Sequence, residues 1–402
     1  MSDVKKTPKL RFKGFTDDWE QRKLSDIADV YDGTHQTPNY KNAGIMFLSV
    51  ENIKTLKSEK YISEQDFKNN FKISPEKGDV LMTRIGDVGT ANVVESNEPI
   101  AFYVSLALLK TRSIDSYFLC SSIESPYLQS NIRKRTLITA IPQKINKDEI
   151  GKVDINVPDK REQVSIGTLF KTLNKAITLQ QRKLDQLNEL KKALLQKMLS
   201  NGKLKPTLRF KEFSDNWKQY KLGQVAKIVG GGTPSTKNSK YWDGSINWYS
   251  PVEINDQVYT ANSQRKITEI GLKKSSARLL PVGTVLFTSR AGIGNTAILT
   301  KEACTNQGFQ SIVPDKDKLD SYFIYSMTAQ LKRYGETHGA GSTFIEVSGK
   351  EMAKMPIVLP SYSEQLRISS IFSKIDITIS TQQNKIDKLN SFKKSLLQNM
   401  FI

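Results

Sequence analysis

The chain has 402 residues, of which 38% are hydrophobic and 9% aromatic, so it can build folded cores and is not a disordered basic tail. Lys and Arg number 60 against 41 Asp and Glu, and the resulting net charge of +19 favours a polyanionic partner. With only Cys120, Cys304 and two histidines, the composition argues against a disulfide framework, a clustered zinc site and His-rich metal sites.

The sequence contains no sign of membrane insertion. The first ten residues lack the apolar stretch of a signal peptide, and no apolar run approaches the roughly 18 residues that a membrane span needs. We therefore expect a cytoplasmic protein. At roughly 100 to 200 residues per domain, the length allows more than one domain.

The chain opens with a motif that returns 198 residues later. Residues 10–15 read LRFKGF and residues 208–213 read LRFKEF. Trp19 and Trp217 follow at matching positions, and we expect both to be buried core residues. The chain is therefore an internal duplication of two units of about 200 residues each.

Between the repeated segments, each unit has a sequence of its own. Short apolar or β-branched runs bounded by turn residues predict strands at 44–50, 79–82 and 284–288. Helical patterns cover residues 115–128 and 320–334. Each unit is therefore expected to be a mixed α/β domain.

Two loops combine small turn residues with donors suited to phosphates or base edges, at 34–41 and 230–238. Arg84 and Arg290 each follow a predicted strand and precede a glycine-rich turn. Their side chains are expected either to reach a DNA groove or to anchor the turn through backbone hydrogen bonds. The candidate DNA-contacting residues are Thr34, His35, Gln36, Lys41, Asn52, Arg84, Thr233, Ser235, Lys237, Lys240, Asn255 and Arg290.

Each unit ends in a segment that predicts a long helix. Residues 162–198 and 364–400 are identical at 17 of 37 positions and carry apolar residues at heptad spacing. A capping box begins each helix, with Glu162 or Glu364 expected to bind the amide of the N-cap residue. A rod of this length measures about 55 Å.

A heptad stripe needs a partner, and the other copy is the nearest candidate. We expect the two helices to pair antiparallel, which brings Gln180 and Gln382 together near their midpoints. The residues expected to pair the helices or dock partners are Phe170, Leu173, Ile177, Gln180, Leu187, Leu194, Phe372, Ile375, Ile379, Gln382, Leu389 and Leu396.

The glycine-rich runs and the Ser-Pro-Tyr segment carry no enzyme signature. The glycine-rich runs at 230–232 and 339–343 lack the Lys-Ser or Lys-Thr ending of a phosphate-binding loop. Residues 125–127 (SPY) lack the preceding Asn or Asp and the second proline of an amino-methyltransferase motif. No catalytic residue and no metal ligand are therefore assigned.

The repeated motifs resemble those of the DNA-specificity subunit of type I restriction-modification systems. The resemblance rests on the openings at 24–34 and 222–234, the turns beginning Gly78-Asp79 and Gly283-Thr284, and the Glu-Gln start and Lys-Lys-x-Leu-Leu-Gln end of both helices. It covers essentially the whole chain. The first unit departs from the pattern at residues 32–36 (DGTHQ), where the second has Gly-Gly-Gly-Thr-Pro.

The resemblance implies an α+β protein with two target recognition domains, two long antiparallel helices forming a coiled coil, and an internal pseudo-twofold repeat. Each domain would read one half of an asymmetric, bipartite sequence in double-stranded DNA. The chain itself would be non-catalytic and hold no cofactor. S-adenosylmethionine, ATP and Mg²⁺ would belong to the modification (adenine methyltransferase) and restriction (translocase and nuclease) subunits that it docks.

These expectations divide the chain into four segments. Residues 1–157 form the first recognition domain, 158–202 the first spacer helix, 203–359 the second recognition domain and 360–402 the second spacer helix. Two alternatives stay open: a self-contained DNA-modifying enzyme with an unrecognised site, and a coiled-coil adaptor whose basic charge is incidental.

Overall fold

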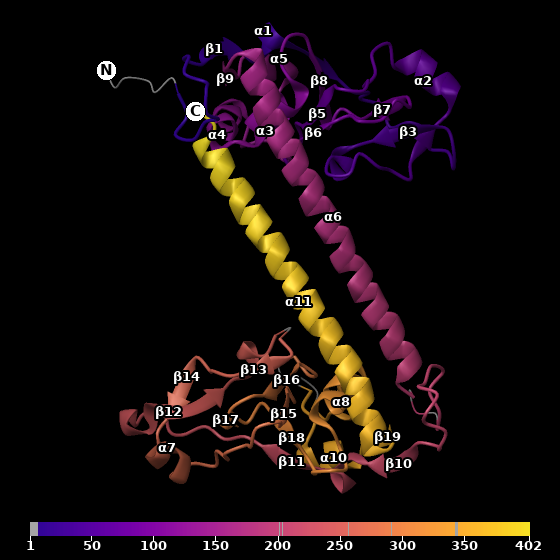
Figure 1. Ribbon diagram of the computed structural model, residues 1–402, viewed down its shortest axis with the longest axis vertical. Helices are drawn as coiled ribbons and strands as arrows, with labels where there is room; N and C mark the ends of the chain where they lie inside the picture. The colour runs from indigo at the N-terminus through magenta and orange to yellow at the C-terminus, as the bar shows by residue number, and fades with distance from the viewer. Residues whose placement is uncertain (1–6, 201, 203, 256, 291, 342–344) are drawn as a thin grey trace. The chain divides into compact units, whose positions relative to one another are not determined.

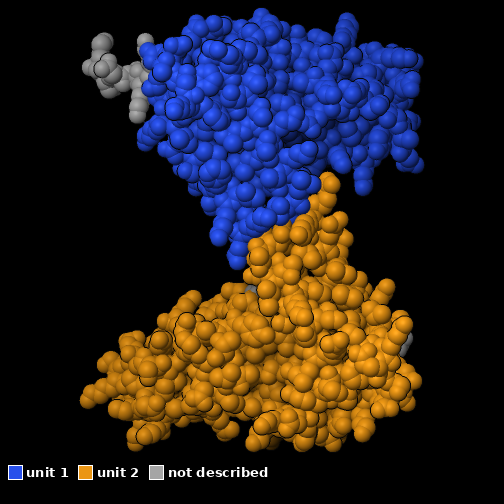
Figure 2. All heavy atoms as spheres, viewed as in Figure 1, with its two compact units in different colours: residues 1–181, 384–402 blue, residues 182–383 orange. Residues whose placement is uncertain are grey.

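The computed structural model describes residues 7–200, 202, 204–255, 257–290, 292–341 and 345–402. The chain divides into two units, which Figure 2 shows in different colours. Unit 1 contains residues 1–181 and 384–402, and unit 2 contains residues 182–383. Each unit therefore includes part of both long helices.

Unit 1 begins with short strands and helices and then enters the first long helix (Figure 1). Its strands are β1 (Glu20–Lys23), β2 (Ala28–Asp32), β3 (Ile45–Leu48), β4 (Tyr61–Ile62), β5 (Val80–Thr83), β6 (Ala91–Val93), β7 (Ile100–Phe102), β8 (Leu106–Thr111) and β9 (Asp154–Val157). Its helices are α1 (Leu24–Ile27), the 3₁₀ turn η1 (Val50–Asn52), α2 (Glu64–Asn70), α3 (Ser116–Glu124), α4 (Pro126–Arg135), α5 (Lys147–Gly151) and the first half of α6 (Lys160–Met198).

The main sheet of unit 1 has the strand order β2-β8-β5-β6 and is antiparallel. Successive side chains of a strand point to opposite faces. In β5, Val80 and Met82 accordingly enter the core that contains the helices, whereas Leu81 enters the core shared with the smaller sheet β4-β3-β7. The helical core also takes in the last residues of the chain, because Phe401 packs on Phe170 with 5.6 Å between the ring centroids.

Unit 2 repeats this plan. Its strands are β10 (Lys218–Lys221), β11 (Ala226–Gly230), β12 (Trp242–Tyr249), β13 (Tyr259–Thr260), β14 (Arg265–Ile267), β15 (Val285–Phe287), β16 (Thr296–Leu299), β17 (Ala303–Thr305), β18 (Gln310–Pro314) and β19 (Pro356–Leu359). Its helices are η2 (Leu222–Gln224), η3 (Ser239–Tyr241), η4 (Pro251–Glu253), α7 (Glu269–Lys273), α8 (Ser321–Ser326), α9 (Thr328–His338), α10 (Gly349–Lys354) and the first half of α11 (Tyr362–Asn399).

The sheets of unit 2 are ordered β11-β18-β15-β16-β13 and β14-β12-β17, with β10 paired to β19. The alternation seen in β5 recurs in β15, where Val285 and Phe287 face the helical core and Leu286 faces the second core. The predicted strands and the α+β class with its internal repeat are thereby confirmed. Trp19 and Trp217 are buried as expected, at 4% and 2% exposure.

The helices expected at 115–128 and 320–334 are each broken in two. Ser125 ends α3 and caps α4, because its side chain accepts from the Leu128 amide and Pro126 takes the first helical position. In unit 2 the break falls at Met327, between α8 and α9. Within the described residues, no helix is both long and apolar enough to cross a membrane.

Candidate nucleic-acid interface

An N-terminal arm in each unit joins the start of one long helix to the end of the other. In unit 1, Arg11 donates from Nε and Nη2 to the two carboxylate oxygens of Glu162, both at 2.7 Å. The neighbouring Leu10 amide donates to the carbonyl of Asn399, near the end of α11, at 2.9 Å. We call this arrangement the helix clamp.

Unit 2 has the same clamp. Arg209 donates to both oxygens of Glu364 at 2.7 Å, and the Leu208 amide donates to the carbonyl of Lys197 at 2.8 Å. The repeated LRF motif therefore fixes how the long helices start and end in each unit. Since the start of one helix meets the end of the other, the helices run antiparallel in each unit.

Only one of the two hydrogen bonds expected in each capping box is present. The Glu162 amide donates to the Asp159 side chain at 3.3 Å and the Glu364 amide to Ser361 at 3.4 Å, as a capping box requires. The reciprocal half is wrong, because the glutamate carboxylates bind Arg11 and Arg209 instead of the N-cap amides.

The glutamine that follows each of these glutamates ties the start of the long helix to the start of α3 or α8. Gln163 accepts from the Asp115 amide at 2.9 Å and donates to the Pro158 carbonyl at 2.9 Å. Gln365 accepts from the Asp320 amide at 2.9 Å and donates to the Pro360 carbonyl at 3.2 Å. The repeated Glu-Gln pair thus connects the arm, the long helix and the start of α3 or α8.

The residues predicted to pair the helices are distributed over both units. One core of unit 1 contains Phe170, Leu173, Ile177, Leu389 and Leu396. One core of unit 2 contains Leu194, Phe372 and Ile375. Gln382 is buried, whereas Gln180, Leu187 and Ile379 are half-buried. The meeting of Gln180 with Gln382 stays a prediction.

Lys191 of α6 and the equivalent Lys393 of α11 have different partners in the two units. In unit 2, Lys191 Nζ lies 2.5 Å from Asp376, which also accepts a hydrogen bond from the Tyr322 hydroxyl. Burial and this hydrogen bond raise the pKa of Tyr322. In unit 1, Lys393 Nζ lies 2.8 Å from Glu124 at the end of α3. In unit 2 the ion pair thus joins the two long helices, and Tyr322 of α8 binds the same carboxylate. In unit 1 the ion pair joins α11 to α3.

The first candidate loop presents several exposed donors. His35, Gln36 and Lys41 are exposed, and Thr34 is half-buried. The loop starts where the backbone passes very close to β7, since a Cβ on Gly33 would lie only 2.4 Å from the Phe102 carbonyl oxygen. Asn52 instead stabilises a turn, accepting from the Ser49 amide at 3.0 Å and donating to the Lys57 carbonyl at 2.8 Å.

Arg84 and Arg290 have different surroundings. Arg84 is 6% exposed, forms an ion pair with Asp32 and donates from Nε to the Ile145 carbonyl at 3.1 Å. Of the two interpretations that the sequence left open, its contacts fit the anchoring one. Arg290 is half-buried and lies 3.5 Å from Glu346.

Two buried tryptophans hold the second candidate loop in place through hydrogen bonds to its backbone. The indole nitrogen of Trp248 donates to the Gly232 carbonyl at 2.9 Å, and that of Trp242 donates to the Ser235 carbonyl at 3.1 Å. Ser235, Lys237 and Lys240 are exposed around these anchored carbonyls. The triple glycine therefore serves close backbone packing, since a Cβ on Gly231 would lie 2.0 Å from the Asn306 carbonyl oxygen.

Two further predicted contacts border the same region of unit 2. Thr233 is half-buried and donates to the side-chain oxygen of Gln307 at 2.6 Å. Asn255 is exposed, and its amide donates to Gln257 at 3.1 Å. The assignment of these residues to DNA stays a prediction.

Sequence reasoning missed a cation that lies over an aromatic ring in each unit. The guanidinium carbon of Arg265 lies 3.6 Å from the Trp242 ring centroid, and Lys60 Nζ lies 5.5 Å from the Tyr40 ring centroid. Neither pair is close in sequence. Trp242 and Arg265 lie on the paired strands β12 and β14, and Tyr40 and Lys60 lie beside the Lys41–Tyr61 bridge. No local motif therefore signals either pair.

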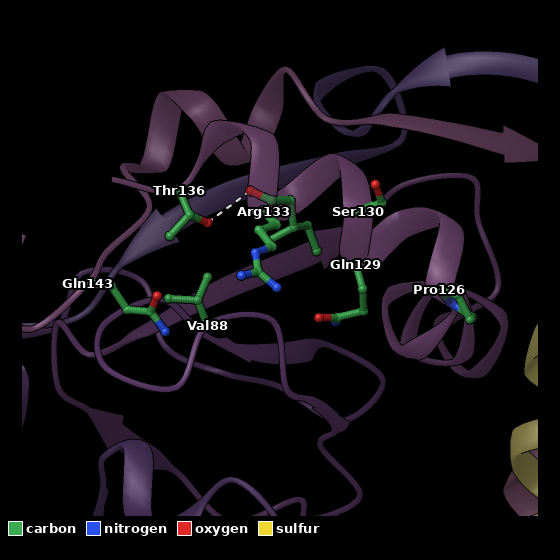
Figure 3. A pocket seen from close by; sticks show the side chains of 8 residues that line it. Val88, Pro126, Gln129, Ser130, Arg133, Thr136 and Gln143 are labelled. Atoms are coloured by element: carbon green, nitrogen blue, oxygen red, sulfur yellow. Dashed lines mark hydrogen bonds between the residues drawn. The ribbon is translucent and has the colours of Figure 1, made fainter. Parts of the chain in front are cut away.

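A polar groove of about 500 Å³ lies beside α4 in unit 1 (Figure 3). Gln129 donates to the Gly89 carbonyl at 2.6 Å and Gln143 to the Gly86 carbonyl at 2.9 Å, so these lining side chains fix the glycine-rich turn after Arg84. Arg133 supplies the only charged side chain among the lining residues. Among the residues that the structure describes, no group of three His, Cys, Asp or Glu is placed to hold a metal ion.

Comparisons of the sequence identify relatives of the chain. The chain is 36% identical over 191 residues to the type I restriction enzyme MjaIX specificity subunit of Methanocaldococcus jannaschii, a match covering 46% of this chain and 44% of that protein. It is 27% identical over 271 residues to the EcoR124I/EcoR124II specificity subunit of Escherichia coli, covering 65% and 62%. These alignments span less than two thirds of either relative.

The fold has a counterpart among solved structures. The S subunit of a type I restriction-modification system from M. genitalium superposes with a TM-score of 0.69 at 14% identity, covering 98% of this chain and 99% of that one. The family model described as the type I restriction modification DNA specificity domain matches residues 16–189 and again residues 214–391. The chain therefore belongs to the type I restriction-modification DNA-specificity family.

Proposed function

We propose that this chain is the DNA-recognition subunit of a type I restriction-modification complex and that each unit reads one half of a bipartite target. The observation that carries the proposal is the pair of units with one architecture and different loops. The sheets and the helix clamp recur, whereas the loops at 34–41 and 230–238 differ in sequence and support. Two recognition units that share a fold but differ in their loops bind different half-sites, so the whole target is asymmetric.

The long helices supply the spacing and the docking surface. Two readers on one duplex face contact half-sites about one helical turn, roughly 34 to 36 Å, apart. We assign residues 158–202 and 360–402 to this spacer, and residues 1–157 and 203–359 to the recognition domains. In this proposal the paired helices set the half-site separation.

Matching apolar side chains on the two helices support the docking of two copies of one partner. Val164 and Leu366 are equivalent residues, each 45% exposed, and Leu190 and Phe392 are equivalent residues, 49% and 54% exposed. Because both pairs recur at the same places of the two helices, we take them as docking positions for two copies of one partner. The modification subunits of the complex would dock at these exposed residues. The restriction subunits would join the same assembly, and its location would be the cytoplasm.

Catalysis belongs to the partner subunits in this proposal. The modification subunits would bind S-adenosylmethionine and methylate adenine, and the restriction subunits would use ATP and Mg²⁺. The pure chain incubated with DNA, Mg²⁺, ATP and S-adenosylmethionine should neither methylate nor cleave. Either product would favour the self-contained enzyme.

Exchange of residues 1–157 for the corresponding unit of another family member tests the division of labour. In the assembled complex, one half of the methylated sequence should change and the other half should stay. Change in both halves, or in neither, would contradict modular reading. An adaptor with incidental charge would instead bind DNA with little dependence on salt, whereas several phosphate contacts make affinity fall steeply as salt rises.

A further inference from the structure

The two cations missed by the sequence occupy equivalent positions in the two units. In unit 1, the Phe47 amide of β3 donates to the Lys60 carbonyl at 2.8 Å, just before β4. In unit 2, Trp248 of β12 is the register partner of Arg265 in β14. Both β3 and β12 also pair in parallel with the third strand of their small sheet. Lys60 and Arg265 therefore occupy structurally equivalent positions in the two units.

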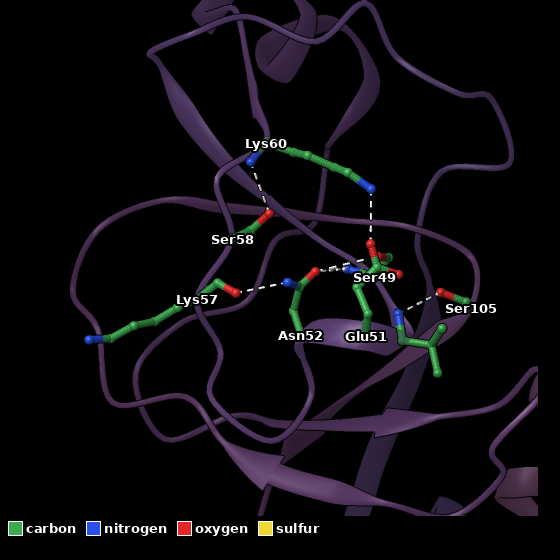
Figure 4. A network of polar contacts seen from close by, with 8 residues as sticks. Ser49, Glu51, Asn52, Lys57, Ser58, Lys60 and Ser105 are labelled. Carbon is green, nitrogen blue, oxygen red and sulfur yellow. Dashed lines mark hydrogen bonds and ion pairs between the residues drawn. The ribbon is translucent and has the colours of Figure 1, made fainter. Parts of the chain in front are cut away.

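In unit 1 an acid neutralises this cation. Lys60 Nζ lies 2.9 Å from the Glu51 carboxylate, in a network that Figure 4 shows. Glu51 is the second residue of turn η1, which Ser49 caps. Two hydrogen bonds lower the pKa of Glu51; the one from Lys60 has the larger effect and the one from Ser49 the next largest. The carboxylate is thus charged at neutral pH and cancels the charge of Lys60.

Unit 2 keeps the turn and lacks this acid. Turn η4 begins after Ser250, and its second residue is Val252, which is 78% exposed. The third residue, Glu253, accepts instead from the Ser250 amide at 2.8 Å and the Gln264 amide at 2.6 Å. Among the described residues, none of the ion pairs involves Arg265.

The aromatic ring beneath Arg265 connects it to the second candidate loop. Trp242 contacts the guanidinium with its ring and holds the Ser235 carbonyl with its indole N–H. Trp242 and Trp248 are packed edge to face with their centroids 5.0 Å apart, and both are buried. A guanidinium resting on this support loses less side-chain entropy when it binds a ligand.

We propose that Arg265 is a DNA-contacting residue of unit 2, and that Glu51 removes the equivalent contact from unit 1 by pairing with Lys60. The inference rests on the proposed function and identifies a positive charge that is free to bind DNA in unit 2 and neutralised in unit 1. Arginine binds either a phosphate or the O6 and N7 atoms of guanine, and both are hydrogen-bond acceptors of DNA.

Replacement of the guanidinium is the direct test. The chain assembled with its modification subunits is titrated with a 40-bp duplex that carries the sequence methylated by the wild-type complex, at several KCl concentrations. Arg265→Gln should weaken binding by about 5- to 100-fold and reduce the salt dependence by about one phosphate contact. Lys218→Gln removes a charge from the separate β10-β19 pair of the same unit and should leave both quantities unchanged.

Two exchanges at the turn position provide a matched control. Val252→Glu should pair with Arg265 as Glu51 pairs with Lys60 and should weaken binding, whereas Val252→Gln should not. In the Arg265→Gln background, Val252→Glu should have a much smaller effect. Glu51→Val should free Lys60 and tighten binding by unit 1, with a steeper salt dependence.

The outcomes separate this inference from the proposed function. If the wild-type complex binds in a salt-dependent manner and Arg265→Gln binds equally well, the inference fails and the proposed function stands. If the wild-type complex does not bind the duplex, the proposed function fails. A loss that is uniform over all sequences identifies a phosphate contact, and relaxed specificity at one base pair identifies a guanine contact.

Discussion

Removal of Arg11 from the helix clamp should destabilise unit 1 strongly. The Glu162 side chain is fully buried and that of Arg11 is 12% exposed, with two hydrogen bonds of 2.7 Å between them. Arg11→Ala leaves a buried carboxylate without a partner, a change that costs about 3–5 kcal/mol. Because whole domains are stable by only about 5–15 kcal/mol, this is a large share of the stability of unit 1.

Hydrogen exchange resolved by peptide is the appropriate assay, because it reports an opening free energy for each unit separately. Arg11→Ala should accelerate exchange in the core amides of unit 1 and leave those of unit 2 unchanged. Arg209→Ala should do the reverse. Arg22→Ala is the matched control, because its ion pair with Glu20 is exposed and should matter little.

A double variant separates the cost of an unpaired charge from the loss of the contact itself. Arg11→Met with Glu162→Leu leaves no buried charge and should recover most of the lost stability. A loss below about 1 kcal/mol in Arg11→Ala, or a double variant no better than the single one, would refute the reasoning.

Three further perturbations address the helices and the unit 1 ion pair. Leu389→Asp places a charge in the unit 1 core and should lower the melting temperature and weaken subunit docking, measured by calorimetry and co-purification; unchanged values of both would contradict helix pairing. Leu190→Glu or Phe392→Glu alters an exposed position, so the melting temperature should hold while the complex loses one modification subunit by mass; retention of both subunits would contradict the docking face. Lys60→Met should return the pKa of the Glu51 carboxyl toward its ordinary value of 4.5, followed by NMR titration. The pair's small stabilisation is present above pH 4.5 and lost as pH falls through the lowered pKa, and an unmoved midpoint in Lys60→Met would count against the pair.

The features that the sequence predicted well are those with a local periodic or repeated signal. The long helices follow from heptad spacing, and the duplication follows from the repeated LRF motif and the 17 identities in 37 helix positions. The break at Ser125 was missed although Ser-Pro is a helix-start signal, because the apolar pattern continues across it. Where a periodic pattern and a cap signal compete, the cap decides the boundary.

Features that depend on contacts between residues far apart in the chain could not be predicted from the sequence. Glu162 reads as a capping residue until Arg11, 151 positions away, is seen to bind it. For Arg84 the sequence leaves a groove contact and a turn anchor equally open until Asp32 and Ile145 are seen around it. Arg265 carries no motif at all, since its significance depends on strand register and on the side chain at position 252.

The core of unit 1 has a consequence for the synthesis of the chain. Phe401 packs against Trp19 and Phe118, with ring centroids 6.2 and 5.7 Å apart, and Asn156 donates to the Ile402 carbonyl at 2.6 Å. These partners leave the ribosome hundreds of residues apart. Unit 1 therefore stays incomplete until translation has passed through the whole of unit 2, and a chain that terminates within unit 2 lacks the side chains that complete the unit 1 core.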